Sequence, residues 1–398
     1  DAGDFDIRTQ SQYAVVLSLV HTWEDFGLKR DQTTIDQDRN YVDIRVPDGK
    51  PDILQQVEHG VLALLAQHRS VGHAIPGIIV PTLGQYTHLG DASTMTDNRI
   101  YDPGLKPGQT KGEYSGEPDD RWAFTTHTTP LNYGSAAALA AASRVLKGYD
   151  DKLAGECLSV ARQVWNYEQN HEPALYRSGN TTGDGLEFEK LKTAVELYIS
   201  TSDPVYMEAI YSLWPVVEKR VAFMGPLVIR VLPSMDAGHR EQLKELVGEY
   251  AGQLDSLLAE NPYRVPVTRG GWAGSGAVVN FAISNYLFHK AFPELVPAQL
   301  TLDAMQYIFG CHPGSDISFV SGVGTWSETQ AYGNNRADFS FINGGVVPGV
   351  LILPPDFPEH MHDWPFLWGE SEYVIPLGAA YIYAVNAANE LSGELMSE

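Results

Sequence analysis

Apolar residues recur three and four positions apart along most of this chain of 398 residues, and that period constrains the fold more than any other feature. Such spacing places the apolar side chains on one face of an α-helix. It predicts helices in ten segments, namely residues 7–26, 51–69, 131–146, 152–167, 186–200, 204–222, 242–260, 278–291, 300–309 and 373–390. Asp4 or Asp6 is expected to begin the first helix. We therefore expect an all-α protein.

Two long segments between the helices, residues 71–122 and 310–368, are rich in Gly, Pro and aromatic residues. Irregular segments of this length on a helical scaffold are usually functional. Residues 31–50 read as a polar loop, and the apolar alternation in residues 75–89 is compatible with a small β-hairpin. Composition does not shift abruptly along the chain. We therefore expect the helices to pair into an α/α barrel that forms one domain over residues 1–398.

The charge balance is strongly acidic, with 27 Lys and Arg against 50 Asp and Glu and a formal net charge of −23. A surface of that sign repels nucleic acid and anionic lipid headgroups. The longest apolar stretches, such as residues 346–353, are far shorter than the roughly 20 residues of a membrane-spanning helix. We therefore expect neither a nucleic-acid partner nor insertion into a membrane.

Cys157 and Cys311 are the two cysteines, and we expect both to be buried free thiols. The sequence opens at Asp1 without the basic region and apolar run of a signal peptide. Its first residues already belong to a motif described next, so we expect further residues upstream.

Two pairs of acidic residues stand at the starts of predicted helices near opposite ends of the chain. Asp1 and Asp4 flank Ala and Gly, whereas Glu370 and Glu372 follow an aromatic segment at 364–368. Either pair alone could be a helix cap. Hydrolysis of a glycosidic bond, however, needs one carboxyl group kept protonated beside apolar rings and another kept ionised to activate water. The two pairs together favour that chemistry.

The sequence Asp-Ala-Gly-Asp at residues 1–4 and Ser-Glu at residues 371–372 resemble the two catalytic motifs of glycoside hydrolase family 9, with Ser in place of the usual Asn. Other segments resemble motifs of the same family in the same order, namely Pro-Asp-Ile-Leu at 51–54, the Ala-rich run at 136–147, Tyr-Ile-Phe-Gly-Cys-His-Pro at 307–313 and Ser-Phe-Val-Ser-Gly-Val-Gly at 318–324. The resemblance covers essentially the whole chain.

This resemblance implies an (α/α)6 barrel that hydrolyses its substrate by single displacement with inversion. Asp4 would be the general base that activates water, Asp1 would help to hold that water, and Glu372 would be the general acid that protonates the leaving oxygen. Twelve barrel helices would require the first one or two to precede Asp1, in keeping with the expected upstream residues.

Substrate contacts are expected in the second long irregular segment. Many relatives read Pro-His-His-Arg where this chain has Gly-Asn-Asn-Arg at residues 333–336. The resemblance makes Arg336 a sugar contact, and Asn335 can still hydrogen-bond to hydroxyl groups. Among aromatic residues that could stack on sugar rings, which also include Trp122, Trp364 and Tyr373, we favour Trp272, Trp326 and Tyr332, because each lies among loop glycines.

Residues 344–349, 355–359 and 364–368 resemble the branch of the family that carries an immunoglobulin-like domain before the barrel, so such a domain is expected upstream. Metal binding is a weaker alternative. Loop aspartates that could bind structural calcium are Asp97, Asp102, Asp119 and Asp120. His360, His362 and Asp363 could be read as zinc ligands, but no second cluster has a recognised spacing, so we predict no catalytic metal.

The predicted function is therefore an inverting hydrolase of β-1,4-linked glucan, such as cellulose, mixed-linkage glucan, xyloglucan or cello-oligosaccharides, secreted or in the periplasm or at the cell surface. It would require no cofactor, with a structural calcium left open. Two alternatives remain, which are an exo-acting β-glucosidase or β-glucosaminidase of the same family and a carbohydrate-binding barrel that has lost catalysis.

Overall fold

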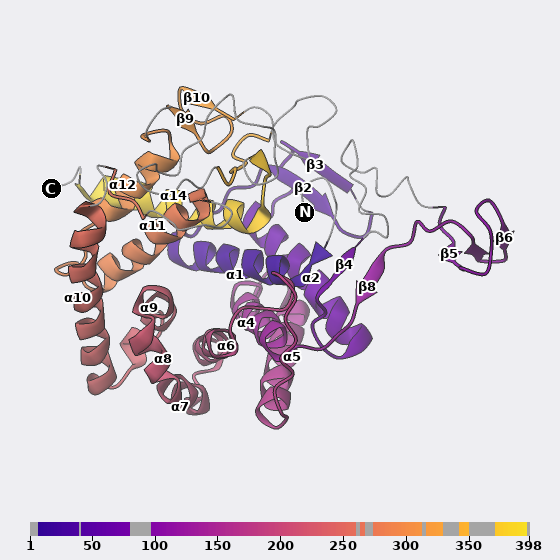
Figure 1. Cartoon of the computed structure of the whole chain (residues 1–398), viewed down its shortest axis with the longest axis horizontal. Helices are drawn as coiled ribbons and strands as arrows, with labels where there is room; N and C mark the ends of the chain where they lie inside the picture. The colour runs from indigo at the N-terminus through magenta and orange to yellow at the C-terminus, as the bar shows by residue number, and fades with distance from the viewer. Residues whose placement is uncertain are drawn as a thin grey trace.

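The computed structural model is mostly helical, with about 58% of residues in helices and twelve α-helices in the part of the chain that it describes (Figure 1). The described residues are 7–39, 41–79, 97–259, 263–266, 274–312, 316–328, 342–349 and 371–395. None of the helices within these ranges is both long and apolar enough to cross a membrane. The predicted all-α class is confirmed.

Six helices form a closed inner ring. They are α1 (Thr9–Phe26), α4 (Thr129–Val145), α6 (Leu186–Thr201), α9 (Val221–Ile229), α11 (Gly274–Ala291) and α14 (Ile375–Leu395). Each contacts the next in this order, and α14 contacts α1. Outside them lie α2 (Asp52–Val71), α5 (Asp151–Gln169), α7 (Pro204–Ser212), α8 (Trp214–Lys219), α10 (Ala237–Ala259) and α12 (Gln299–Ile308), with a short 3₁₀ helix at Leu232–Ser234. This is the arrangement of an α/α barrel, as the sequence predicts.

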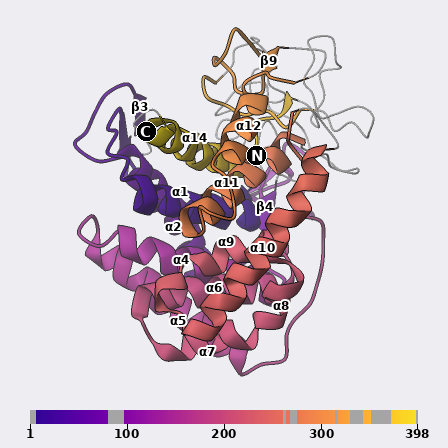
Figure 2. The same ribbon diagram turned by 90° about the vertical axis from the view of Figure 1, so that its left-hand side faces the viewer.

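Hydrogen bonds between side chains show that α1, α4 and α6 run in the same direction. Tyr13, early in α1, donates to Glu189, early in α6, and Arg144, late in α4, contacts Glu24, late in α1. Figures 1 and 2 show α14 beside α1 and parallel to it. We call the end at which these helices begin the N-terminal end of the barrel. Residues 1–4 precede α1, so the sequence attaches the first acidic motif to this end.

Helix α4 is buried on all sides because its side chains are small. Every alanine from 136 to 142 is buried, as are the polar residues Asn132 and Ser135. A Cβ atom on Gly134 would lie 2.4 Å from the ring of Tyr13 in α1, so only glycine permits this approach. The Ala-rich run therefore lets α1, α5 and α6 pack closely around α4.

A network of buried charges joins four inner helices at the opposite, C-terminal end of the barrel. Arg144 contacts Glu24 at 2.6 Å and Glu196 at 2.7 Å, while His21 contacts the other oxygen of Glu196 at 2.8 Å. Arg230, which ends α9, contacts Glu24 at 2.7 Å. Burial alone would raise the pKa of Glu196, but the charge of Arg144 and the contact with His21 hold that pKa well below its usual range.

Small sheets lie between the helices, and several differ from the sequence predictions. One sheet joins β1 (Ile7–Arg8), β4 (Gly77–Ile79) and β8 (Trp122–Phe124), and a hairpin joins β2 (Thr33–Asp36) and β3 (Tyr41–Ile44). A third sheet joins β5 (Ile100–Tyr101), β7 (Tyr114–Ser115) and β6 (Thr110–Lys111). The last two strands, β9 (Ile317–Ser318) and β10 (Trp326–Ser327), pair with each other. The hairpin is therefore at 33–44, which the sequence analysis read as loop. Strand β4 pairs with β1 and β8, and residues 80–89 lie outside the described ranges.

Three further predictions are corrected. The first helix begins at Thr9 after β1, so neither Asp4 nor Asp6 starts it. The single helix predicted at 204–222 is divided into α7, α8 and the start of α9, because Pro215 cannot donate a backbone hydrogen bond and Arg220 leaves the helical conformation. Both cysteines are free, but only Cys157 is buried, whereas Cys311 is exposed.

Candidate active site

Of the eight residues predicted to act on substrate, Glu372 and Trp326 lie within the described ranges. The others lie outside them, namely Asp1, Asp4, Trp272, Tyr332, Asn335 and Arg336. The distance between Asp4 and Glu372 and the sugar contacts of the second long loop therefore stay predictions. The described residues do show how the backbone around Glu372 is held.

Glu372 stands three residues before α14, between two buried neighbours, Ser371 and Tyr373. The hydroxyl oxygen of Tyr373 lies 2.6 Å from that of Ser321 and accepts a hydrogen bond from the backbone N–H of Ile342. Gly345 packs under the ring of Tyr373, where a Cβ atom would come within 2.6 Å of a ring carbon. These contacts fix the chain on the C-terminal side of Glu372.

Two loop segments, 316–328 and 342–349, surround this point because apolar residues anchor them in the core. Phe319 is fully buried, and its carbonyl accepts a hydrogen bond from the N–H of Val347. Ser275, at the start of α11, donates its N–H to the carbonyl of Pro348 and its hydroxyl to that of Val347. The starts of α11 and α14 are thereby joined at the N-terminal end of the barrel.

Trp326 is held in an exposed position on the first of these segments. It pairs with Ile317 in the short parallel ladder of β10 and β9, and its side chain is 56% exposed. Gly322 and Gly324 adopt φ angles of 76° and 88°, which side chains other than glycine rarely reach. The loop thus presents an indole ring to solvent, as the prediction of sugar stacking at Trp326 requires.

A buried polar layer at the starts of α1, α4 and α6 was not predicted. Glu189 is fully buried and accepts hydrogen bonds from the hydroxyl of Tyr13 at 2.6 Å and from Lys192 at 2.9 Å. Burial, together with the charges of Glu189 and Asp184, raises the pKa of the Tyr13 phenol well above its ordinary value. No motif in the sequence distinguishes Glu189 from a surface residue of an amphipathic helix.

The carboxylate of Glu168, at the end of α5, is also held by hydrogen-bond donors from within the protein. Its carboxylate lies 2.8 Å from the imidazole of His127 and accepts hydrogen bonds from Thr129 at 2.7 Å and Asn132 at 2.6 Å. Burial would raise the pKa of Glu168, but these donors outweigh it and lower that pKa. Because the oxygens of Glu168, Glu189 and Glu196 are already held by internal donors, we assign these three buried carboxylates to the structure and not to catalysis.

A cavity of about 650 Å³ opens between the ends of α2 and α5 and the start of α4. Imidazole rings of His68, His73 and His127 line it, with Asn132 and Tyr167. The rings of His73 and His127 meet edge to face, with centroids 5.1 Å apart. Burial, with a smaller contribution from the charge of nearby His73, lowers the pKa of His68 to about 4.

This depressed pKa predicts a pH-dependent stability. His68 titrates near 6.5 in the unfolded chain and near 4 when folded, so as the pH falls the unfolded state binds the proton first. The stabilising effect of the neutral imidazole is complete above about pH 6.5 and is lost between there and pH 4. The native protein should therefore lose up to about 3 kcal/mol more unfolding free energy over this range than a His68→Gln variant.

Urea denaturation at pH 7, 5.5 and 4 measures this difference. His59→Gln is the control: because His59 is exposed, this variant measures how removal of a surface imidazole changes the unfolding free energy. A constant gap in stability between the His68→Gln variant and the native protein at all three pH values would contradict the prediction.

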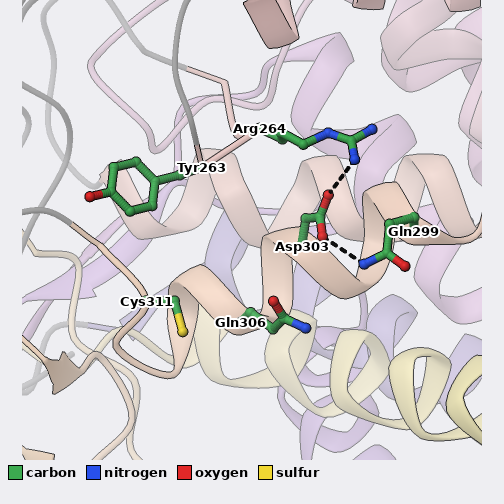
Figure 3. A pocket seen from close by; sticks show the side chains of 6 residues that line it. All are labelled: Tyr263, Arg264, Gln299, Asp303, Gln306 and Cys311. Carbon is green, nitrogen blue, oxygen red and sulfur yellow. Dashed lines mark hydrogen bonds and ion pairs between the residues drawn. The ribbon is translucent and has the colours of Figure 1, made fainter.

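A second cavity, of about 260 Å³, lies along the outer helix α12 (Figure 3). Asp303 forms an ion pair with Arg264 at 3.3 Å and accepts a hydrogen bond from the amide of Gln299 at 2.7 Å. Figure 3 shows Gln306 and Cys311 on its lower side, with a single carboxylate among the residues drawn. Because glycoside hydrolysis needs two carboxyl groups, this cavity does not provide the chemistry.

The loop aspartates considered as calcium ligands accept backbone hydrogen bonds. Asp97 accepts from the N–H of Arg99, Asp102 from that of Gly104, and Asp120 from that of Tyr101. No group of three or more His, Cys, Asp or Glu side chains suited to a metal ion occurs among the described residues. The possible zinc ligands at 360–363 lie outside those ranges.

Comparison with known proteins gives one family and many related structures. The sequence profile described as "Glycosyl hydrolase family 9" matches residues 1–385. No protein in a search of curated sequences matches the chain. A metagenome-derived glycoside hydrolase family 9 endoglucanase is 20% identical with a TM-score of 0.71, over 98% of this chain and 70% of its own.

Two other solved structures show the range of identity, coverage and TM-score among the matches. AaCel9A, in complex with cellobiose-like isofagomine, is 17% identical with a TM-score of 0.71, over 98% of this chain and 74% of its own. An endoglucanase from the termite Nasutitermes takasagoensis is 18% identical with a TM-score of 0.65, over 99% of this chain and 88% of its own. At these identities the structures support the (α/α)6 fold, in agreement with the inner ring described above.

Proposed function

Because the chain belongs to glycosyl hydrolase family 9, we propose that this glycoside hydrolase is an endo-β-1,4-glucanase that cleaves its substrate by single displacement with inversion. The observation that carries this proposal is that the family match spans residues 1–385, and so includes both acidic motifs, Asp1 to Asp4 and Glu372. A barrel that only bound carbohydrate would need neither an acid nor a base.

In the proposed mechanism Asp4 takes a proton from water as that water attacks the anomeric carbon, and Asp1 helps to position the water. Glu372 gives a proton to the departing glycosidic oxygen. The neighbourhood of Glu372 suits this task, since the adjacent Tyr373 and the loop beneath it are buried and exclude water from one side. As general acid, Glu372 would have to hold its proton until the glycosidic oxygen departs. Both catalytic groups are side chains, so the reaction requires no cofactor.

A neutral glucan suits the rest of the molecule. The net charge of −23 disfavours anionic polymers, whereas the exposed indole of Trp326 offers an apolar face for a sugar ring. Arg336 and Asn335 would hydrogen-bond to sugar hydroxyls. The cellobiose-like ligand of AaCel9A and the endoglucanase names of the other structural relatives support a β-1,4-linked substrate.

The anomeric form of the first product tests the mechanism. Single displacement requires room for a water molecule between the two carboxyl groups, about 6.5 to 9.5 Å, and releases the α-anomer from a β-glycoside. We expect proton NMR of a fresh digest of cellotetraose to show the α-anomer first, followed by mutarotation. Initial release of the β-anomer would overturn the proposal, because it requires a covalent intermediate. Products of the digest also distinguish internal cleavage from release of single glucose units.

We also propose that residues 1–398 act as one catalytic domain of a longer secreted, periplasmic or surface-attached polypeptide with an immunoglobulin-like domain before the barrel. The likeness of residues 344–349, 355–359 and 364–368 to that branch of the family supports the proposal. The reading frame upstream of the codon for Asp1 tests it. An upstream segment without short strands of alternating polarity would contradict it.

A further inference from the structure

Strand β8 carries two large aromatic side chains that remain about half exposed. Trp122 is 54% exposed and Phe124 is 48% exposed. Residues two apart in a strand point to the same side of a sheet, so the two rings share one face, and Ala123 between them points to the other. Exposed apolar side chains that form one contiguous patch often mark a binding site.

The sheet that carries these rings leads directly to the first acidic motif. Trp122 pairs with Ile79 and Phe124 with Gly77 in β4, and Gly77 pairs in turn with Arg8 in β1. Ile7, the first residue of β1, lies only three positions after Asp4 in the sequence. Three residues of chain span at most about 11 Å, and two strand spacings add about 10 Å. Trp122 and Phe124 are therefore within a few sugar units of the proposed general base.

The same sheet is fixed to the N-terminal end of the barrel. The N–H of Thr9, the first residue of α1, donates to the carbonyl of Pro76 just before β4. A Cβ atom on Gly77 would come within 2.5 Å of the carbonyl oxygen of Ile7, so glycine allows β4 to approach β1 closely. Figure 1 shows β4 and β8 together beside the start of α1. The aromatic face thus has a defined position relative to the start of the chain's first helix.

We propose that Trp122 and Phe124 form a stacking platform that binds sugar rings of a β-glucan chain beyond the bond that is cleaved. The inference rests on the proposed function and adds a binding subsite to it. The pyranose rings of such a glucan present apolar C–H groups on their faces, which stack on aromatic rings. Side chains two apart in a strand are about 6.6 Å apart, a separation that lets both rings contact one extended polymer.

The test compares a polymer with a substrate too short to reach the platform. Trp122→Ala, Phe124→Ala and the double variant are assayed on mixed-linkage β-glucan and on 4-nitrophenyl β-cellobioside. The platform predicts that the ratio of kcat/KM on the polymer to that on the short glycoside falls about tenfold in the double variant, mainly through a higher polymer KM. Because both side chains are already half exposed, the variants should fold like the native protein, and thermal unfolding checks this.

Tyr41→Ala is the matched control. Tyr41 is also an exposed aromatic residue in a strand, but its hairpin, β2–β3, is a separate sheet, and Figure 2 shows β3 at the upper left, apart from β4. In this control, the ratio of kcat/KM on the polymer to that on the short glycoside should equal that of the native protein.

If the native protein cleaves β-glucan and the double variant keeps the native ratio, the platform is wrong and the proposed function stands. If the native protein cleaves no β-glucan, both fail. Analytical ultracentrifugation of the double variant adds a further outcome. If its ratio of kcat/KM values is native but its self-association differs from that of the native protein, the aromatic face binds a second copy of the chain and the platform is wrong.

Discussion

Replacement of Glu372 by Gln is expected to lower kcat on β-glucan by at least about a hundredfold, because a positioned general acid contributes a factor of that order. Glutamine has nearly the same shape but cannot give a proton to the leaving oxygen. Asp4→Asn should cause a loss of similar size, since the attacking water would keep its proton. Initial rates on mixed-linkage glucan, measured with reducing-end detection, give both values.

Glu370→Gln is the control for the first of these changes. It removes a carboxylate two positions away in sequence, but only Glu372 aligns with the family's catalytic motif, so Glu370→Gln should be much milder. A larger loss in Glu370→Gln than in Glu372→Gln would transfer the acid role to Glu370. Near-native activity of Asp4→Asn would reject Asp4 as the base.

Arg144→Met should lower the free energy of unfolding by about 3 to 5 kcal/mol, the usual effect of removing one partner from a buried ion pair. Arg144 contacts both Glu24 and Glu196, and the carboxylate of Glu196 is almost completely buried. Without the guanidinium, that carboxylate would keep the imidazole of His21 at 2.8 Å and the charge of Arg230. Urea denaturation at pH 7 measures the loss.

Arg69→Met provides the comparison for a surface pair. Arg69 contacts Glu156 at 2.6 Å, but the two side chains are 51% and 31% exposed, so its loss should cost less than about 1 kcal/mol. Adding Glu196→Gln to Arg144→Met should restore part of the stability, because no unpaired charge would then be buried. An Arg144→Met loss no larger than that of Arg69→Met would show that the network contributes little.

The sequence predicts the fold well where apolar spacing is regular. Helices α1, α2, α4, α5, α6, α11 and α12 lie within a few residues of their predicted ranges. Helix α9 was missed beyond its first two residues, although it belongs to the inner ring, because it is short, contains Gly225 and Pro226 and is apolar on most sides. None of its nine residues is polar, so it lacks the amphipathic period from which helices are recognised.

The sequence does not reveal the buried acidic residues near the site, because their burial depends on contacts between distant segments. A recognised motif around Glu372 and the glycines beside Trp326 led to the roles predicted for these two residues, and both roles stay predictions. Glu168 and Glu189 lie on ordinary amphipathic helices, and their burial depends on partners such as Tyr13 and His127 that are distant in sequence. No local pattern records which charged residues of a helix will face the interior of a closed ring. The β2–β3 hairpin was missed because polar residues dominate the segment around its strands.

The contact between α1 and α14 also determines when the barrel can form during synthesis. The hydroxyl of Tyr383 donates to Asp25, and these residues are 358 positions apart. A ribosome adding roughly 5 to 20 residues per second needs about 20 to 70 s to cover that stretch. During this time the apolar face of α1 lacks the last member of its ring and is open to misassociation. Asp4 is synthesised at the beginning of this interval and Glu372 near its end. A partly synthesised chain that lacks Glu372 therefore cannot hydrolyse a glycoside by the proposed mechanism.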